Sequence, residues 1–159
     1  MKAHQKNSSS LRRRAAMTFL GVVIVLTIGA CSHTMNMLGR GVKPPAESEF
    51  GLGPRSSAQG RYVATLQPAQ PLRVRKLQTI QVAITDAAGQ PLDGATIDID
   101  GGMPQHGHGL PTRPRVTKNL GGGTYQIEGV RFNLCGWWEF KLAIAGAAGP
   151  DTVTFNIAL

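Results

Sequence analysis

The sequence predicts an all-β protein whose globular part is an antiparallel β-sandwich of about seven strands. Three observations support this prediction. Apolar and polar residues alternate in several short segments, as they do in sheets that bury one face. Clusters of Gly, Pro, Asn and Asp separate these segments and are typical of turns. Residues 61–159 contain no stretch with the period of an amphipathic helix.

The expected strands follow one another at spacings typical of an immunoglobulin-like sandwich. In residues 79–86, Ile80, Val82 and Ile84 share one face and alternate with polar or small residues. Residues 95–100 and 124–129 show the same alternation, and GGG at 121–123 precedes a strand, so it is a turn rather than a phosphate loop. The expected strands cover residues 61–66, 79–86, 95–100, 113–118, 124–129, 136–145 and 151–159.

The segment GWWEFKLAIA at 136–145 predicts which aromatic rings enter the core. Trp138, Phe140 and Leu142 share one face, which makes Trp138 an ordinary core residue. Trp137 falls on the other, polar face with Glu139. A large ring on such a face is unusual unless a loop covers it or a partner protein binds it.

The first thirty residues are typical of a targeting segment. An arginine cluster at 12–14 leads into 16 apolar or small residues, fewer than the roughly 20 that span a bilayer. The sequence IGAC at 28–31 resembles the lipobox of bacterial lipoproteins. That resemblance implies a mature chain that begins at lipidated Cys31 on a membrane outside the cytoplasm, and Ser32 favours the outer membrane. An uncleaved signal anchor is the alternative, and it places the rest of the chain on the same side.

The predicted organisation is therefore a signal peptide at 1–30, a flexible tether at 31–60 rich in Gly, Pro and Ser, and a sandwich domain at 61–159. Residues 1–30 hold five of the 17 basic residues and no acidic residue, which leaves 12 basic against 9 acidic residues, a net charge of +3. Because the basic character belongs largely to the targeting segment, the sequence gives little support for nucleic-acid binding.

The stretch MPQHGHGLPTRP at 103–114 is the main candidate for chemistry. In an extended segment His106 and His108 project to one side, and Met103 can add a thioether. Imidazole suits copper and zinc, and thioether favours Cu(I), so the set indicates copper before zinc or iron. The alternative is structural, because glycines and prolines make a sharp turn and histidines hydrogen-bond to its free carbonyls. A looser copper candidate is His33, Met35 and Met37 in the tether.

Two cysteines are present, Cys31 and Cys135. If Cys31 is acylated, no intramolecular disulfide can form, and a thiol at Cys135 is then expected to be buried or to bind metal. No nucleophile elbow, phosphate-binding loop or zinc-protease helix is present in the sequence, so we expect the protein not to be an enzyme.

The segments TDAAGQPLDGATIDIDGGMPQHGHGLPTRPRVT and GGGTYQIEGVRFNLCGWWEFKLAI resemble the FixH/YtkA-like family of bacterial envelope proteins. The resemblance implies a small, membrane-anchored immunoglobulin-like sandwich associated with copper handling or with the assembly of copper or haem enzymes. Met103, His106 and His108 match the family's Met- and His-bearing loop. Cys135 is a departure, because relatives commonly have a methionine or a small residue there, and it is an additional candidate copper ligand.

These observations predict a lipid-anchored periplasmic accessory protein that binds copper through His106, His108, Met103 and Cys135. The competing hypothesis is an interaction module without metal, in which residues 103–114 and Trp137 dock on an envelope partner.

Overall fold

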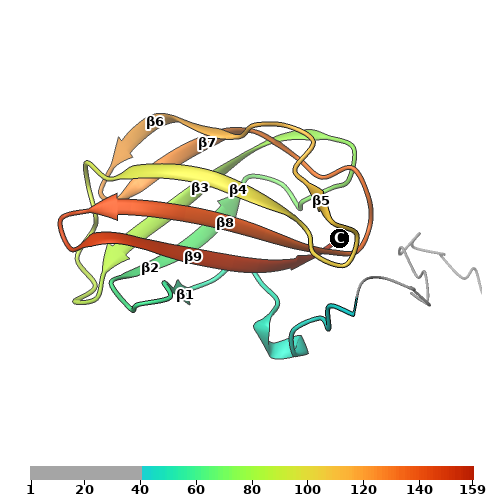
Figure 1. Cartoon of the computed structure of the whole chain (residues 1–159). Helices are drawn as coiled ribbons and strands as arrows, with labels where there is room; N and C mark the ends of the chain where they lie inside the picture. Colours follow the sequence, from blue (N-terminus) through green and yellow to red (C-terminus); the bar gives the residue numbers. More distant parts are fainter. Residues whose placement is uncertain (1–40) are drawn as a thin grey trace, which may run out of the picture. The chain divides into compact units, whose positions relative to one another are not determined.

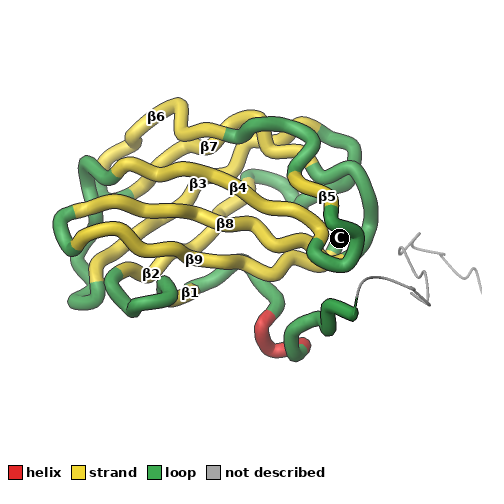
Figure 2. The backbone as a smooth tube through the Cα atoms, in the orientation of Figure 1, coloured by secondary structure: helices red, strands yellow, loops and turns green. Residues whose placement is uncertain are grey.

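The computed structural model describes residues 41–159, which form a sandwich of two antiparallel sheets (Figures 1 and 2). One sheet has five strands in the order β1-β2-β3-β7-β6, and the other has four in the order β5-β4-β8-β9. The predicted all-β sandwich is confirmed. The strands are β1 (Arg55–Ser56), β2 (Tyr62–Pro68), β3 (Leu77–Asp86), β4 (Thr96–Met103), β5 (His108–Gly109), β6 (Arg115–Gly121), β7 (Thr124–Arg131), β8 (Trp137–Gly146) and β9 (Gly149–Ala158).

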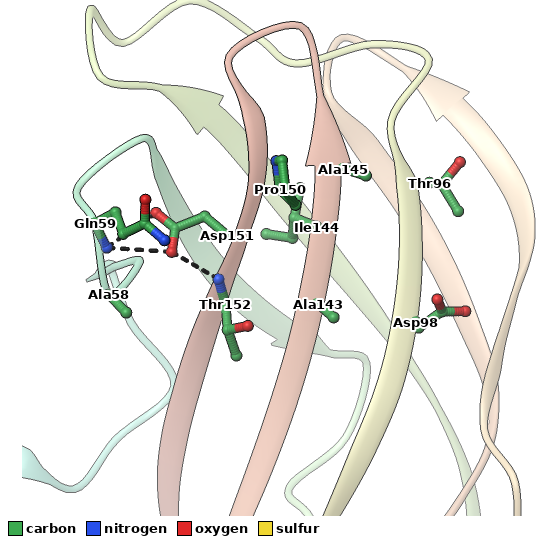
Figure 3. A pocket seen from close by; sticks show the side chains of 10 residues that line it. All are labelled: Ala58, Gln59, Thr96, Asp98, Ala143, Ile144, Ala145, Pro150, Asp151 and Thr152. Carbon is green, nitrogen blue, oxygen red and sulfur yellow. Dashed lines mark hydrogen bonds between the residues drawn. The ribbon is translucent and has the colours of Figure 1, made fainter.

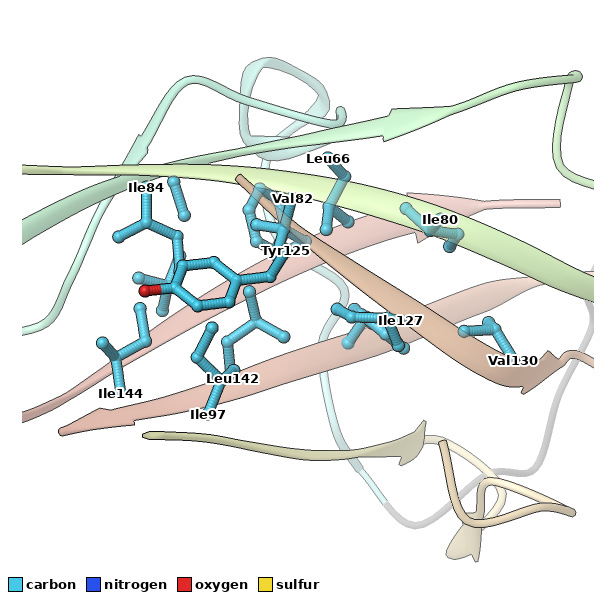
Figure 4. Packing of buried hydrophobic residues seen from close by; sticks show 14 of the residues in the cluster. Leu66, Ile80, Val82, Ile84, Ile97, Tyr125, Ile127, Val130, Leu142 and Ile144 are labelled. Atoms are coloured by element: carbon cyan, nitrogen blue, oxygen red, sulfur yellow. The ribbon is translucent and has the colours of Figure 1, made fainter. Parts of the chain in front are cut away.

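Each of the seven predicted segments overlaps one strand, and the inward residues are those that the alternation indicates. Ile80, Val82 and Ile84 of β3 are at most 1% exposed. Figure 4 shows Val82 beside Tyr125, with Leu142 of the other sheet within the same cluster. The two strands that the sequence did not predict, β1 and β5, have two residues each, which is too short for alternation to be recognised.

The folded part begins earlier than the sequence predicts. The expected flexible tether runs to residue 60, whereas the structure has a 3-10 turn, η1 (Glu47–Glu49), and strand β1 within it. Backbone hydrogen bonds order this segment: Gly51 N–H donates to the Asn156 carbonyl at 2.9 Å, and the Leu52 carbonyl accepts from Leu66 N–H at 2.7 Å. Backbone hydrogen bonds do not require alternating apolar residues. The Gly- and Pro-rich composition of this segment therefore gave no sign of them.

The described core joins the two sheets. Its buried residues run from Tyr62 to Ile157, and the half-buried residues packed against them lie between Leu52 and Leu159. The Tyr125 hydroxyl orders one corner, because Tyr125 Oη donates to the Leu92 carbonyl at 2.6 Å and accepts from Ala95 N–H at 3.0 Å. This cluster fills the space between the two sheets of residues 41–159.

The helical content of residues 41–159 is limited to η1, and none of it has the length and apolarity needed to cross a bilayer. The predicted signal peptide, the lipidation at Cys31, and the looser set His33, Met35 and Met37 all lie outside the described residues. They remain predictions.

Candidate functional site

The histidine-bearing loop is a tight hairpin between β4 and β5. Met103 pairs with His108, and the intervening turn closes when His106 N–H and Gly107 N–H both donate to the Met103 carbonyl, at 3.0 and 2.9 Å. Gly107 has a φ of 66°, which a side chain disfavours, and a Cβ on Gly102 would run into the His108 carbonyl. The turn alone therefore requires these glycines, as the structural interpretation expects.

The two imidazoles lie next to each other on this hairpin. The ring centroids of His106 and His108 are 6.3 Å apart and the ring planes differ by 12°. His106 is half-buried and His108 is exposed. Two nitrogens that share one ion at about 2 Å each lie at most about 4 Å apart, and rings at this separation reach that distance by side-chain rotation. The pair can therefore hold one ion at the surface.

Met103 is not part of this surface. Its side chain is 1% exposed and belongs to the hydrophobic core. The reason is strand parity: Ile97, Ile99 and Met103 of β4 all alternate toward the core, and the turn begins only after Met103. The predicted set of two imidazoles and a thioether is thus divided, with the imidazoles outside and the sulfur inside.

Cys135 is half-buried in the connection from β7 to β8 and is not a free cysteine. The ligands that the hairpin offers are therefore His106 and His108. Among residues 41–159, no three or more His, Cys, Asp or Glu side chains gather as they would around a metal ion. An ion on the hairpin would accordingly have two imidazoles from this region and would complete its coordination from elsewhere.

Trp137 does not form a docking surface. It is 8% exposed, and its indole Nε1–H donates to Asn156 Oδ1 at 3.0 Å. The Asn156 amide in turn donates to the Glu49 carbonyl of η1 at 3.3 Å. The ring does lie on the outward side of β8, but its polar edge is satisfied within the protein. Of the two parts of the proposed docking surface, Trp137 is therefore not available, and only the hairpin remains.

A hollow of about 330 Å³ lies beside the hairpin. Its walls include Asp100, Glu139 and Lys141, which the sequence analysis did not single out, and its floor includes glycines of β4 and β5. Lys141 Nζ and a Glu139 oxygen form an ion pair at 2.7 Å. A partly exposed pair of this kind contributes little to stability, but it neutralises one of the two carboxylates in the hollow.

A second polar cluster at the opposite end of the sandwich serves the fold. Asp151 is 6% exposed and accepts hydrogen bonds from Ser57 Oγ at 2.6 Å and Arg61 N–H at 3.3 Å. It also accepts hydrogen bonds from Thr152 N–H at 2.8 Å and Gln59 N–H at 3.0 Å (Figure 3). Burial alone raises the pKa of the carboxyl group, but these hydrogen bonds outweigh it and hold the pKa below 3.8. The carboxylate ties the β1–β2 turn to β9 and is committed to that task.

The hollow that Figure 3 shows beside Asp151 has a volume of about 470 Å³. Besides the β1–β2 turn it is lined by Thr96, Asp98 and Ala143, which are exposed and lie on the outward face of the four-stranded sheet. The sequence could not indicate Asp151 as a member of a cluster, because Ser57 lies 94 residues before it.

The fold and the hairpin define a class: a small β-sandwich protein that presents a pair of imidazoles at the edge of one sheet. The chain belongs to the YtkA-like family, whose model matches residues 56–143. The FixH part of the expected resemblance remains a prediction. A comparison with curated proteins gave no match.

Among solved structures, the chain is similar to one described as the ZirS C-terminal domain. The two share 12% sequence identity at a TM-score of 0.37, over 92% of this chain and 99% of that domain. A likeness of this degree does not bear on function.

Proposed function

We propose that this protein is a membrane-anchored accessory protein of the bacterial envelope that binds copper as cargo, for metal handling or for the assembly of copper or haem enzymes. The observation that carries the proposal is the pair of near-parallel imidazoles, 6.3 Å apart, on an accessible hairpin. Imidazole is a good ligand for copper in both common oxidation states. We place the protein on the periplasmic side of the outer membrane, with lipidated Cys31 as the anchor.

Two imidazoles make a weak, exchangeable site, and this suits a carrier better than a storage protein. His106 and His108 would each supply one nitrogen, and solvent or a partner protein would supply the rest. The proposal assigns no catalytic step to these residues, because the sequence offers no catalytic motif around them.

Copper binding is tested by titrating the full chain with Cu(I) and Cu(II) in competition with a chromophoric chelator. The His106→Ala/His108→Ala double variant is expected to lose the binding event. The His33→Ala/Met35→Ala/Met37→Ala variant, which removes the looser candidate set in the tether, distinguishes the two sites and is expected to retain the binding event. Unchanged binding in the first variant, or equal losses in both, would sink the copper proposal.

Anchoring is tested separately. The Cys31→Ser variant should lose metabolic lipid labelling and accumulate as unprocessed precursor. Normal labelling of this variant would contradict lipidation at Cys31, and an intact N-terminus on the labelled wild-type protein would favour the uncleaved anchor.

The second candidate function is docking of an envelope partner protein through the hairpin without metal. The observation in its favour is that Gly107, His108 and Gly109 are exposed on a hairpin that two backbone hydrogen bonds to the Met103 carbonyl close. If the partner binds through the histidine rings themselves, metal-free protein should bind it more strongly than copper-loaded protein, because copper occupies the same ring nitrogens.

A further inference from the structure

Six cationic side chains gather at the end of the sandwich where β3 begins and β7 ends. We call this region the basic end. Backbone pairing brings its members together: Leu77 pairs with Arg131, Arg115 pairs with Glu128, and Gly129 lies against the Arg113 carbonyl. All six charged side chains are exposed. They are Arg73, Arg75, Lys76, Arg113, Arg115 and Arg131.

The loop that carries three of these charges is held in one conformation. The side-chain amide of Gln78 accepts from Arg73 N–H at 2.8 Å and donates to the Arg73 carbonyl at 3.0 Å. Arg75 N–H donates to the Phe132 carbonyl at 2.6 Å. Arg75 also has a φ of 62°, the one positive φ among the non-glycine residues of 41–159. A strained backbone that its surroundings enforce is characteristic of functional segments.

An apolar side chain stands within this ring of charges. Leu77 is 70% exposed, more than any other large hydrophobic residue of the described chain. A single exposed leucine is ordinary on its own. A leucine surrounded by Lys and Arg has the composition of a membrane-interface surface, where the apolar group enters the acyl boundary and the cations meet headgroups.

At this end of the sandwich the cations and the carboxylates lie mainly on different sheets. The basic end holds six of the eleven Lys and Arg residues of 41–159, all on or next to strands of the five-stranded sheet. Three acidic residues lie at or near turns of the opposite end, namely Asp86, Asp93 and Asp151. At the basic end Glu128 accepts a hydrogen bond from Gln126 at 2.6 Å, while the other carboxylates, Asp100, Glu139, Glu47 and Glu49, belong to the four-stranded sheet or lie beside it. An anionic surface would therefore orient the domain with its basic end inward.

The chain enters the domain at this same end. The Val42 carbonyl accepts from the Gln105 side chain at 3.4 Å, and Gln105 is part of the hairpin at the basic end (Figure 1). The eleven residues from Cys31 to Gly41 are joined by ten Cα–Cα steps and span at most about 35 Å when fully extended. If Cys31 is the anchor, as the proposed function holds, the basic end is the part of the domain that a short tether brings to the bilayer.

We propose that the basic end docks on a membrane surface rich in anionic lipid. Arg73, Arg75, Lys76 and Arg131 bind headgroups, and Leu77 enters the interface between headgroups and acyl chains. Docking fixes the domain against the bilayer with the His106/His108 hairpin near the membrane, in position to exchange its cargo with a membrane-embedded partner. The occupant is a lipid surface rather than an acidic protein, because the same end receives the tether.

The test uses residues 41–159, which hold both sheets and the described core, so that binding does not depend on the anchor; a cooperative thermal unfolding transition first establishes that this segment folds. The probe is a set of large unilamellar vesicles of phosphatidylcholine with or without about one third phosphatidylglycerol, in a sedimentation assay at low and physiological salt under reducing conditions. We expect binding to the anionic vesicles only, and weaker binding as salt rises. The copper titration is independent of this assay, so the two proposals fail separately.

Two pairs of matched variants locate the surface. The Arg73→Gln/Lys76→Gln/Arg131→Gln variant should bind roughly a hundredfold more weakly, at about fivefold per cation. The control Arg55→Gln/Arg61→Gln/Lys118→Gln removes the same charge from β1, the β1–β2 turn and β6, and should bind several tens of times more tightly than the first variant. Leu77→Ser should weaken binding about tenfold, whereas Leu120→Ser, an exposed leucine on β6, should not.

Several results would overturn the proposal. They are equal binding to neutral and anionic vesicles, equal losses in the test and control variants, and tighter binding to polyglutamate than to vesicles with no effect of Leu77→Ser. The last result would instead indicate an acidic protein partner. Thermal unfolding of each variant shows whether it is folded, and the single variant Lys76→Gln provides a milder test if a triple variant is not.

Discussion

Two substitutions of Met103 test whether its thioether packs in the core or binds copper. The side chain is 1% exposed and packs in the core at the end of β4. Met103→Ala removes the buried thioether and leaves a cavity, so the free energy of unfolding should fall by about 2–5 kcal/mol. Met103→Leu nearly conserves the volume and should cost less than about 1.5 kcal/mol.

The two variants are compared by urea unfolding and by Cu(I) titration under identical reducing conditions. Because the sulfur lies inside the core, we expect Met103→Leu to retain the Cu(I) affinity of the wild type. The reasoning would be refuted if Met103→Leu kept its stability but bound Cu(I) at least tenfold more weakly. That result would mean that the hairpin opens on metal binding and brings the thioether to the surface.

Three further predictions concern the fold that supports the hairpin. Because the pKa of Asp151 is lowered by folding, its contribution to stability is present above the unfolded value of about 3.8 and lost as pH falls through the lower folded value. The free energy of unfolding, measured between pH 2 and 6, should therefore change less with pH in Asp151→Asn than in the wild type. Tyr125→Phe leaves the Leu92 carbonyl without its donor and should cost about 1–3 kcal/mol in urea unfolding. Gly123→Ala should lower the unfolding midpoint, because φ is 71° and a Cβ would meet the Ile84 carbonyl; an unchanged midpoint would contradict that geometry.

The strands were predictable because each buries one face. Alternation of the kind seen in Ile80, Val82 and Ile84 is a direct consequence of the pleat. It can be recognised in the sequence without knowing how the strands are connected or ordered. The two-residue strands could not be predicted, and neither could the ordered structure of residues 41–60. Both depend on backbone hydrogen bonds to strands far along the chain. Backbone groups are the same in every residue, so they leave no pattern in the sequence.

The site was predictable only in part. The spacing of His106 and His108 indicated two imidazoles close together, and the structure has them 6.3 Å apart. The position of Met103 could have been inferred from parity, since Ile97 and Ile99 precede it on the inward side of the same strand. Asp151 could not be found from the sequence, because a carboxylate's partners are fixed by the fold alone.

The geometry of the hairpin also constrains how copper would move. Two imidazoles leave most of the coordination sphere of an ion open, and the described residues supply no third His, Cys, Asp or Glu at that point. An incoming partner can therefore bind the ion before either histidine releases it, so transfer needs no free ion. If this holds, a soluble thiol or imidazole competitor should accelerate copper release in proportion to its concentration. Release at a rate independent of competitor would show instead that the ion leaves unaided, and an associative transfer through His106 and His108 would be wrong.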